Sequence, residues 1–176
     1  ATLWRPPRDA DAGAGEGAIL QVDADSGQTL RRALVPGGGG VHGMEYDHFE
    51  EGFLWVTTLK DRTLSKIRIE GWTVEHVIAL PYGRAHGVVR AADGVWVVHT
   101  SERVIVKLDL ESGAEMDRVV VPEFEPQPHG LSAYDSDLLY CDATSGWVVK
   151  VSLEHLAKTD RLHFKENADG DGRRII

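Results

Sequence analysis

A repeat with a period in the low forties is the feature that most constrains this chain. The dipeptide His-Gly occurs three times, as His42-Gly43, His86-Gly87 and His129-Gly130, at spacings of 44 and 43 residues. Each copy begins the same phrase: a short apolar run, a polar turn, an aromatic strand and a strand with a central lysine. A fixed period of this length, built of short strands, is typical of β-propeller blades.

Each repeat contains segments that have the character of β-strands. They are short, rich in Val, Ile, Leu and Trp, and bounded by Gly, Asp or Ser. In the second repeat these segments are 87–89, 94–98, 104–110 and 116–121. Four such strands make one blade.

A partial copy precedes the three repeats. Residues 19–23 match 104–109, and the turn Asp25-Ser26-Gly27 matches Glu111-Ser112-Gly113. Leu3-Trp4 corresponds to an aromatic second strand, so the first blade lacks its innermost strand.

The pattern therefore predicts an all-β fold, a β-propeller of four-stranded blades with about three and a half blades present. We expect a partial ring, or half of a propeller of about six or seven blades, rather than a closed four-bladed ring. Residues 1–153 form the blades, with an incomplete first blade at 1–36 and blades that start near 42, 86 and 129. Residues 154–176 are expected to form an acidic C-terminal tail, after a short helix over 152–158.

Charge and hydropathy exclude two classes of partner. The net charge of −9 opposes nonspecific binding to nucleic acid, which needs a basic face. The sequence has no apolar run long enough to span a membrane. These properties predict a soluble protein, either cytoplasmic or secreted or periplasmic after removal of a signal. The single cysteine, Cys141, excludes an internal disulfide.

Propeller geometry turns the repeat into a prediction of a site. Residues at matching repeat positions form a ring around the central axis, and the channel mouth is a natural concave ligand site. We therefore expect His42, His86 and His129 to converge from three adjacent blades. A second ring of polar residues includes His99 and Asp142. Imidazoles beside carboxylates can bind a metal or act as general acid and base.

A structural role for the three histidines is the alternative. Each imidazole can bond a neighbouring backbone carbonyl, while Gly43, Gly87 and Gly130 supply a tight turn. Repetition in every blade favours this interpretation, since catalysis seldom needs three copies of one group. The repeated aromatic residues are expected to pack between blades: Trp55, Trp96 and Tyr140. The repeated lysines are expected on the solvent face of the third strand: Lys66, Lys107 and Lys150.

The phrase Pro128-His129-Gly130-Leu131, followed by Leu139-Tyr140 and by residues 148–151, resembles the blades of the streptogramin (virginiamycin B) lyase-like family. The similarity covers about residues 19–153, and NHL-repeat propellers are more distantly similar. The resemblance implies a magnesium-assisted lyase in which one His-Gly histidine is catalytic. In that family a metal-binding Glu lies two residues before this histidine, and a second Glu ends the next strand.

The resemblance assigns roles to residues of this chain. His129 matches the catalytic position, and His86 is the second catalytic candidate. Asp142 stands for the second carboxylate and is the candidate magnesium ligand, whereas Gln127 replaces the first Glu. Arg84 is expected to clamp an anionic substrate. The ligand-binding candidates are His42, Arg84, His99 and Gln127.

Two functions remain open from the sequence. The first is a small-molecule binder, or a lyase or lactonase-type hydrolase, at the channel mouth, with a divalent metal such as magnesium as cofactor. The second is a non-catalytic scaffold that binds a protein or glycan through its loop face, with Tyr82 and Phe124 as the apolar patch. An open half-ring exposes blade faces, so a homodimer that completes the propeller is the expected partner arrangement.

Overall fold

The computed structural model describes residues 2–5, 17–36, 39–142, 144–154 and 162–164. These residues form four antiparallel sheets, in each of which the strands are hydrogen-bonded in chain order.

We number the sheets as blades 1 to 4. Blade 1 has three strands: β1 (Thr2–Arg5), β2 (Ala18–Asp23) and β3 (Thr29–Leu34). Blade 2 consists of β4 (Val41–Tyr46), β5 (Phe53–Thr58), β6 (Thr63–Arg68) and β7 (Thr73–Ala79). Blade 3 consists of β8 (Ala85–Ala91), β9 (Gly94–His99), β10 (Val104–Leu108) and β11 (Glu115–Val120). Blade 4 consists of β12 (Gly130–Tyr134), β13 (Asp137–Cys141), β14 (Val148–Val151) and β15 (Leu162–Phe164).

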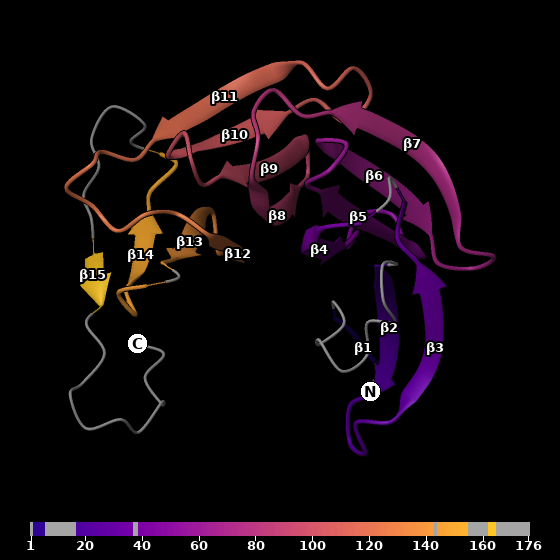
Figure 1. Cartoon of the computed structure of the whole chain (residues 1–176). Helices are drawn as coiled ribbons and strands as arrows, with labels where there is room; N and C mark the ends of the chain where they lie inside the picture. The colour runs from indigo at the N-terminus through magenta and orange to yellow at the C-terminus, as the bar shows by residue number, and fades with distance from the viewer. Residues whose placement is uncertain (1, 6–16, 37–38, 143, 155–161, 165–176) are drawn as a thin grey trace.

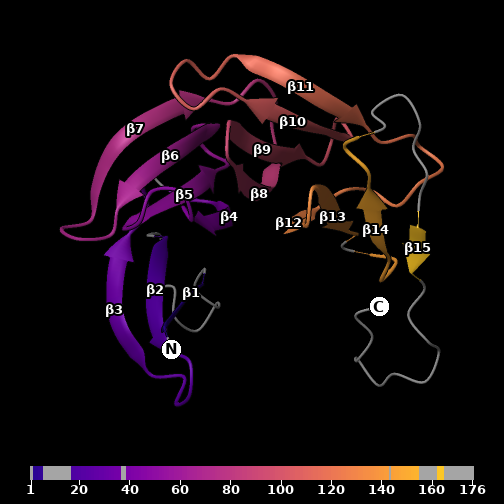
Figure 2. The ribbon, with the colours of Figure 1, turned by 180° about the vertical axis from the view of Figure 1, so that it is seen from behind.

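The four blades follow one another along an open arc (Figures 1 and 2). The first strand of each complete blade, β4, β8 or β12, lies on the inside of the arc, and the last strand lies on the outside (Figure 1). The ring is not closed between blades 1 and 4 (Figure 2). The chain is therefore a partial β-propeller, as the repeat predicts. The dimer that would complete the ring stays a prediction.

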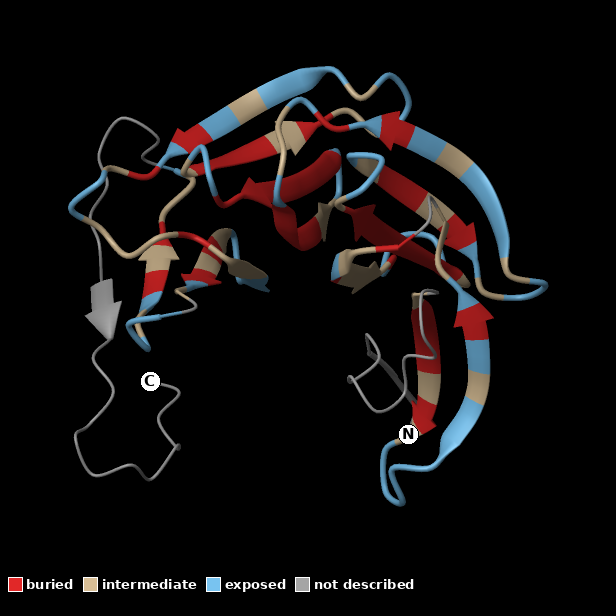
Figure 3. Ribbon diagram, viewed as in Figure 1, coloured by how far each residue is buried: buried red, intermediate tan, exposed pale blue. Residues whose placement is uncertain are grey.

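Burial follows the position of each strand within a blade (Figure 3). Every residue of β5 and β9 is buried, because blades 2 and 3 have a neighbouring blade on both faces. The outer strands β7 and β11 are mostly exposed. No helix of the described residues is long and apolar enough to cross a membrane.

Apolar clusters fill the gaps between blades. Ile19 of blade 1 packs with Val56 of blade 2, and Trp55 of blade 2 packs with Val97 of blade 3. The third gap contains Trp96 and Tyr140. The predicted inter-blade packing of the repeated aromatic residues is confirmed.

The matching turns of blades 1 and 3 have the same geometry, as their sequences predict. In blade 3 the Asp109 carboxylate accepts a bond from the Ser112 backbone N–H at 2.8 Å, and Gly113 has a φ of +70°. In blade 1 Asp23 and Ser26 form the same bond at 2.8 Å, and Gly27 has a φ of +71°. The left-handed backbone explains the glycine that ends each turn.

The lysines of the third strands are not on an open solvent face, which corrects the sequence prediction. Each is half-buried and forms an ion pair with an acidic residue in the turn between the first two strands of its own blade or, for Lys150, with Asp137 at the start of β13. Each ammonium also lies over an aromatic ring of its own blade. The Nζ–carboxylate distances are 2.5 Å for Lys66–Glu50, 2.6 Å for Lys107–Asp93 and 2.8 Å for Lys150–Asp137.

The two ends of the repeat array add strands to blades 1 and 4. In blade 1, Trp4 lies opposite Gln21, as the partial repeat predicts. In blade 4, Leu162–Phe164 pairs with β14, within the segment that the sequence analysis expected to be a tail. Most of the helix expected over 152–158 lies outside the described residues, as does most of the acidic tail.

Candidate functional site

Three imidazoles from three blades are in contact at the inner strands. His42 lies on β4, His86 on β8, and His129 immediately before β12. The ring centroids of His42 and His86 are 4.6 Å apart in an edge-to-face arrangement. Those of His86 and His129 are 3.9 Å apart with the planes tilted by 31°. The predicted convergence is therefore present, and we call these residues the three-imidazole cluster.

The glycine after each histidine allows the inner strands to approach closely. A Cβ atom on Gly43 would lie 1.8 Å from the His86 carbonyl oxygen, and one on Gly87 would lie 2.3 Å from the Leu131 nitrogen. None of the three His-Gly glycines has a positive φ. The expectation that they supply a tight turn is therefore wrong. Gly43 and Gly87 are needed because neighbouring blades meet backbone to backbone, as in the bond from Gly87 N–H to the His129 carbonyl at 2.9 Å, whereas a Cβ on Gly130 would meet the Cys141 Sγ atom of its own blade.

His86 is the buried member of the three-imidazole cluster. Its side chain is buried, and Nδ1 forms a hydrogen bond of 2.7 Å with the Thr100 hydroxyl. Burial lowers the pKa of His86 from 6.5 to about 4, and the nearby His129 and His42 add to the effect, while a hydrogen bond to the Arg84 backbone opposes it. His86 is therefore neutral at physiological pH.

His42 is exposed at the solvent side of the cluster. Partial desolvation lowers its pKa, and His129 and Arg84 contribute to the same shift. His129 is half-buried. The cluster thus joins one buried imidazole to two that solvent can reach.

Thr100 connects the cluster to two other predicted site residues. Its N–H donates to the Arg84 carbonyl at 3.2 Å, and its carbonyl accepts a bond from Gln127 Nε2 at 2.9 Å. Arg84 is exposed and has a left-handed backbone with a φ of +44°. Thr100 therefore bonds to His86, Arg84 and Gln127, a role that sequence reasoning did not assign to it.

His99 belongs to a different environment. It is fully buried, its ring packs edge-to-face against Tyr82 at 5.3 Å, and its Nδ1–H donates to the Gly83 carbonyl at 3.2 Å. Burial lowers the pKa of His99, while Gly83 and Glu102 oppose the shift. Its predicted ligand-binding role stays a prediction.

The Asp142 carboxylate is hydrogen-bonded within its own turn. Its carboxylate accepts bonds from the backbone N–H groups of Thr144 and Ser145, at 3.3 and 3.0 Å. Burial raises the pKa of Asp142, but these bonds outweigh that effect and keep it below its usual range.

The residues at the cluster do not fit a magnesium ion. Magnesium takes oxygen ligands, whereas the cluster presents imidazoles beside an arginine, and the Gln127 amide is bonded to Thr100. No group of three or more His, Cys, Asp and Glu side chains in the described ranges is arranged to hold a metal. The magnesium implied by the resemblance therefore has no ligand set in this part of the chain.

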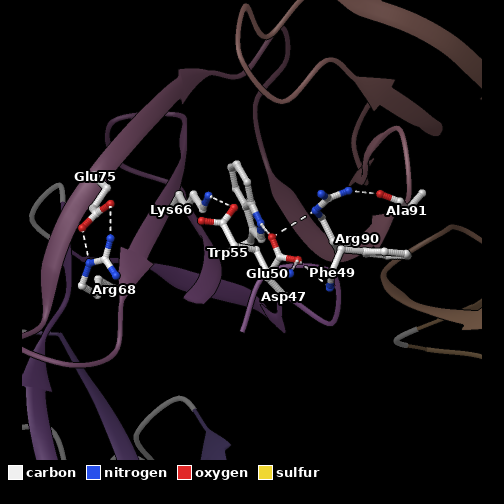
Figure 4. A network of polar contacts seen from close by, with 9 residues as sticks. All are labelled: Asp47, Phe49, Glu50, Trp55, Lys66, Arg68, Glu75, Arg90 and Ala91. Atoms are coloured by element: carbon white, nitrogen blue, oxygen red, sulfur yellow. Dashed lines mark hydrogen bonds and ion pairs between the residues drawn. The ribbon is translucent and has the colours of Figure 1, made fainter. Parts of the chain in front are cut away.

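A polar network between blades 2 and 3 was not predicted from the sequence (Figure 4). The buried Asp47 carboxylate accepts bonds from Trp55 Nε1 at 2.8 Å and Arg90 Nε at 3.1 Å. It also accepts the backbone N–H groups of Phe49 and Glu50, both at 2.9 Å. Burial raises the pKa of Asp47, but the four donors outweigh it and hold the pKa below its usual range. The network links the two blades, because Arg90 of β8 donates to Asp47 between β4 and β5.

A small apolar pocket lies away from the three-imidazole cluster. It is lined by valines of β11 and β14 together with Pro122 and Tyr140. It lies between blades 3 and 4, and its lining carries no titratable group other than Lys150 and Tyr140. The cluster rather than this pocket is therefore the candidate site for chemistry.

Comparison with known proteins supports the fold. No protein-family model matches the chain, and no curated protein matches its sequence. Among solved structures, the glutaminyl cyclase of Myxococcus xanthus matches with a TM-score of 0.64 and 12% identity, over 77% of this chain and 57% of that protein. The virginiamycin B lyase of Staphylococcus aureus matches with a TM-score of 0.60 and 17% identity, over 85% of this chain and 49% of the lyase. A streptogramin B lyase matches with a TM-score of 0.61 and 13% identity, over 96% of this chain and 60% of that protein.

This chain therefore spans about half to three fifths of the length of the proteins it resembles. Identities this low establish the architecture rather than an activity. The chain has the β-propeller fold of streptogramin B lyase, with its blades in an open arc.

Proposed function

We propose that this chain is a small-molecule-binding propeller whose site is the three-imidazole cluster with Arg84 and Gln127. The observation that carries the proposal is the ring contact of His42, His86 and His129 from three separate blades. The inner ends of propeller strands are a usual place for ligand sites.

The finer form of the proposal is a lyase or lactonase-type hydrolase without a magnesium ion bound at the cluster. His129 is the general base, because it is half-buried and can meet a substrate from solvent. His86 is a poor base, since its pKa is about 4. Its buried ring instead holds the rings of His42 and His129 in position. Arg84 binds an anionic part of the substrate.

Imidazole NMR tests this function. The side-chain resonances of the cluster should shift when small esters and lactones are added, while those of His48, on the β4–β5 turn, should not. Turnover of any ester that binds should be lost in His129→Ala and retained in the matched variant His48→Ala. If no compound moves a cluster resonance, the proposal is wrong.

A scaffold function is the second candidate, and one observation favours it. Phe124 is 81% exposed in the loop between blades 3 and 4. Arg103 holds this loop by donating to the carbonyls of Val121, Pro122 and Glu125. An aromatic side chain on an anchored loop suits recognition of a protein or glycan. Binding on a glycan array that Phe124→Ser removes and His42→Gln leaves unchanged would favour the scaffold.

A further inference from the structure

The charges around the three-imidazole cluster indicate which class of small molecule it can hold. The groups that act electrostatically on His42 and His86 are the other imidazoles and Arg84. Their charges disfavour a protonated ring, whereas a hydrogen bond to the Arg84 backbone favours it in His86. No carboxylate of the described residues is among them. The charge partners of His42 and His86 are therefore imidazoles and an arginine, with no counter-ion among them.

The other described elements packed against the cluster contribute mainly neutral polar groups. β5 contributes the Thr57 hydroxyl, which donates to the His86 carbonyl at 3.3 Å, and the end of β9 contributes Thr100. β13 contributes Cys141, whose carbonyl accepts the His129 N–H at 2.9 Å. The carboxylate of Asp142 follows β13, but it accepts bonds from its own turn.

A ligand can approach the positive groups from solvent. His42 and Arg84 are exposed and His129 is half-buried, while His86 is only 2% exposed beneath them. An anionic group placed against the exposed residues would lie close to the buried ring. An opposite charge at such a distance favours the protonated form of an imidazole.

We infer that the cluster binds the carboxylate or phosphate group of a small molecule and takes up a proton from solvent when it does so. This inference rests on the proposed function and names the ligand class of the same site. Only the proton changes partner: it leaves a buffer acid or a hydronium ion and forms an N–H bond on an imidazole, and the resulting cation pairs with the bound anion. By linkage, the proton and the anion each strengthen the binding of the other.

Calorimetry with sulfate tests the coupling on the full chain. Sulfate keeps its charge over the range in which histidine titrates, so any pH dependence belongs to the protein. Affinity should rise as the pH falls, by about tenfold per pH unit where one proton is taken up. Titrations in two buffers with different ionisation heats measure the proton uptake directly. Acetate and inorganic phosphate at one fixed pH then distinguish a carboxylate site from a phosphate site.

Two matched arginine variants locate the binding. Arg84→Gln should weaken sulfate binding by roughly tenfold, as expected for loss of one charge-assisted contact. Arg62→Gln should leave it unchanged, although Arg62 is also exposed and also has a left-handed backbone, with a φ of +52°. His42→Gln should reduce the measured proton uptake.

Each outcome separates the inference from the proposed function. Anion binding at the cluster without proton uptake, or with an affinity independent of pH, overturns the inference and retains the function. Cluster resonances that respond to neutral esters but to none of the three anions do the same. Cluster resonances that respond to neither class overturn both.

Discussion

Blades 3 and 4 contain the same sequence phrase, yet only blade 3 is buried on both faces. In blade 3, the residues that face blade 4 include Val89, Trp96 and Ile105, all buried. The residues 43 positions later are Ser132, Leu139 and Val148, which are half-buried or exposed. They face the open end of the arc.

The opposite face of blade 4 behaves like the interior of the propeller. Leu138, Tyr140, Val149 and Val151 are buried against blade 3. A strand of this repeat is therefore buried or exposed according to whether another blade lies on it. Each blade therefore receives much of its core from its neighbours, as in other repeat architectures.

The largest expected difference concerns the aromatic position. Trp96→Ala should destabilise the protein by about 4 kcal/mol, because it removes a large buried side chain between two blades. Leu139→Ala, at the matching position of blade 4, should cost about 1 kcal/mol or less, because Leu139 has no blade on its outer side. Chemical denaturation measures both free energies of unfolding. Equal losses would show that blade 4 is covered.

The second largest expected difference is between removing the buried Asp47–Arg90 ion pair and removing an exposed ion pair. Asp47→Ala should cost about 3 kcal/mol, because it leaves the Arg90 guanidinium buried without its carboxylate. Asp93→Ala removes the partner of Lys107, but Asp93 is exposed, so the cost should be below about 1 kcal/mol. Thermal and urea unfolding of the two variants compare the pairs. Similar losses would contradict the structural role given to Asp47.

Acid should lower the free energy of unfolding, because the buried His86 is held in its neutral form. The pKa of His86 is about 4 in the folded protein against 6.5 for the unfolded chain. The unfolded state therefore binds more protons between these values. The contribution is complete above about pH 6.5 and is lost as the pH falls to about 4, amounting to about 3 kcal/mol. Urea midpoints across this range should change less in His86→Gln than in the parent, and His48→Gln should follow the parent. An unchanged slope in His86→Gln would count against the buried neutral imidazole.

The smallest difference concerns the inner glycines. Gly87→Ala should cost about 1–3 kcal/mol, because the new Cβ meets the backbone of β12, with Leu131 N at 2.3 Å. Gly130→Ala meets only the Cys141 Sγ atom, at 2.7 Å, and a side chain can move more easily than a strand. Denaturation of the two alanine variants measures the gap. A larger loss at Gly130 would reverse the predicted order.

The repeat allowed a large part of the fold and of the candidate site to be predicted. The period located the strands and placed His42, His86 and His129 at equivalent positions, and ring symmetry then predicted their contact. The sequence could not show which way Asp142 turns, because the Thr144 and Ser145 N–H groups compete for its carboxylate locally. The Asp47–Arg90 pair was also missed, because its partners are 43 residues apart and occur in a single blade interface.

Alignment by residue type also misplaced one aromatic residue. The register sets Leu139 rather than Tyr140 opposite Lys150, whereas Trp96 lies opposite Lys107. Tyr140 consequently faces blade 3. One residue of offset reverses the face of a strand, because side chains alternate.

The sequence by itself determined the all-β class, the four-stranded unit and the residues that reach the inner strands, because these follow from local periodicity. The tertiary structure decided which faces are covered, why glycine must follow His42 and His86, and how far each imidazole is desolvated. Those properties depend on the backbone and charges of the neighbouring blade. A strand's own residues do not encode the distance at which the next blade packs.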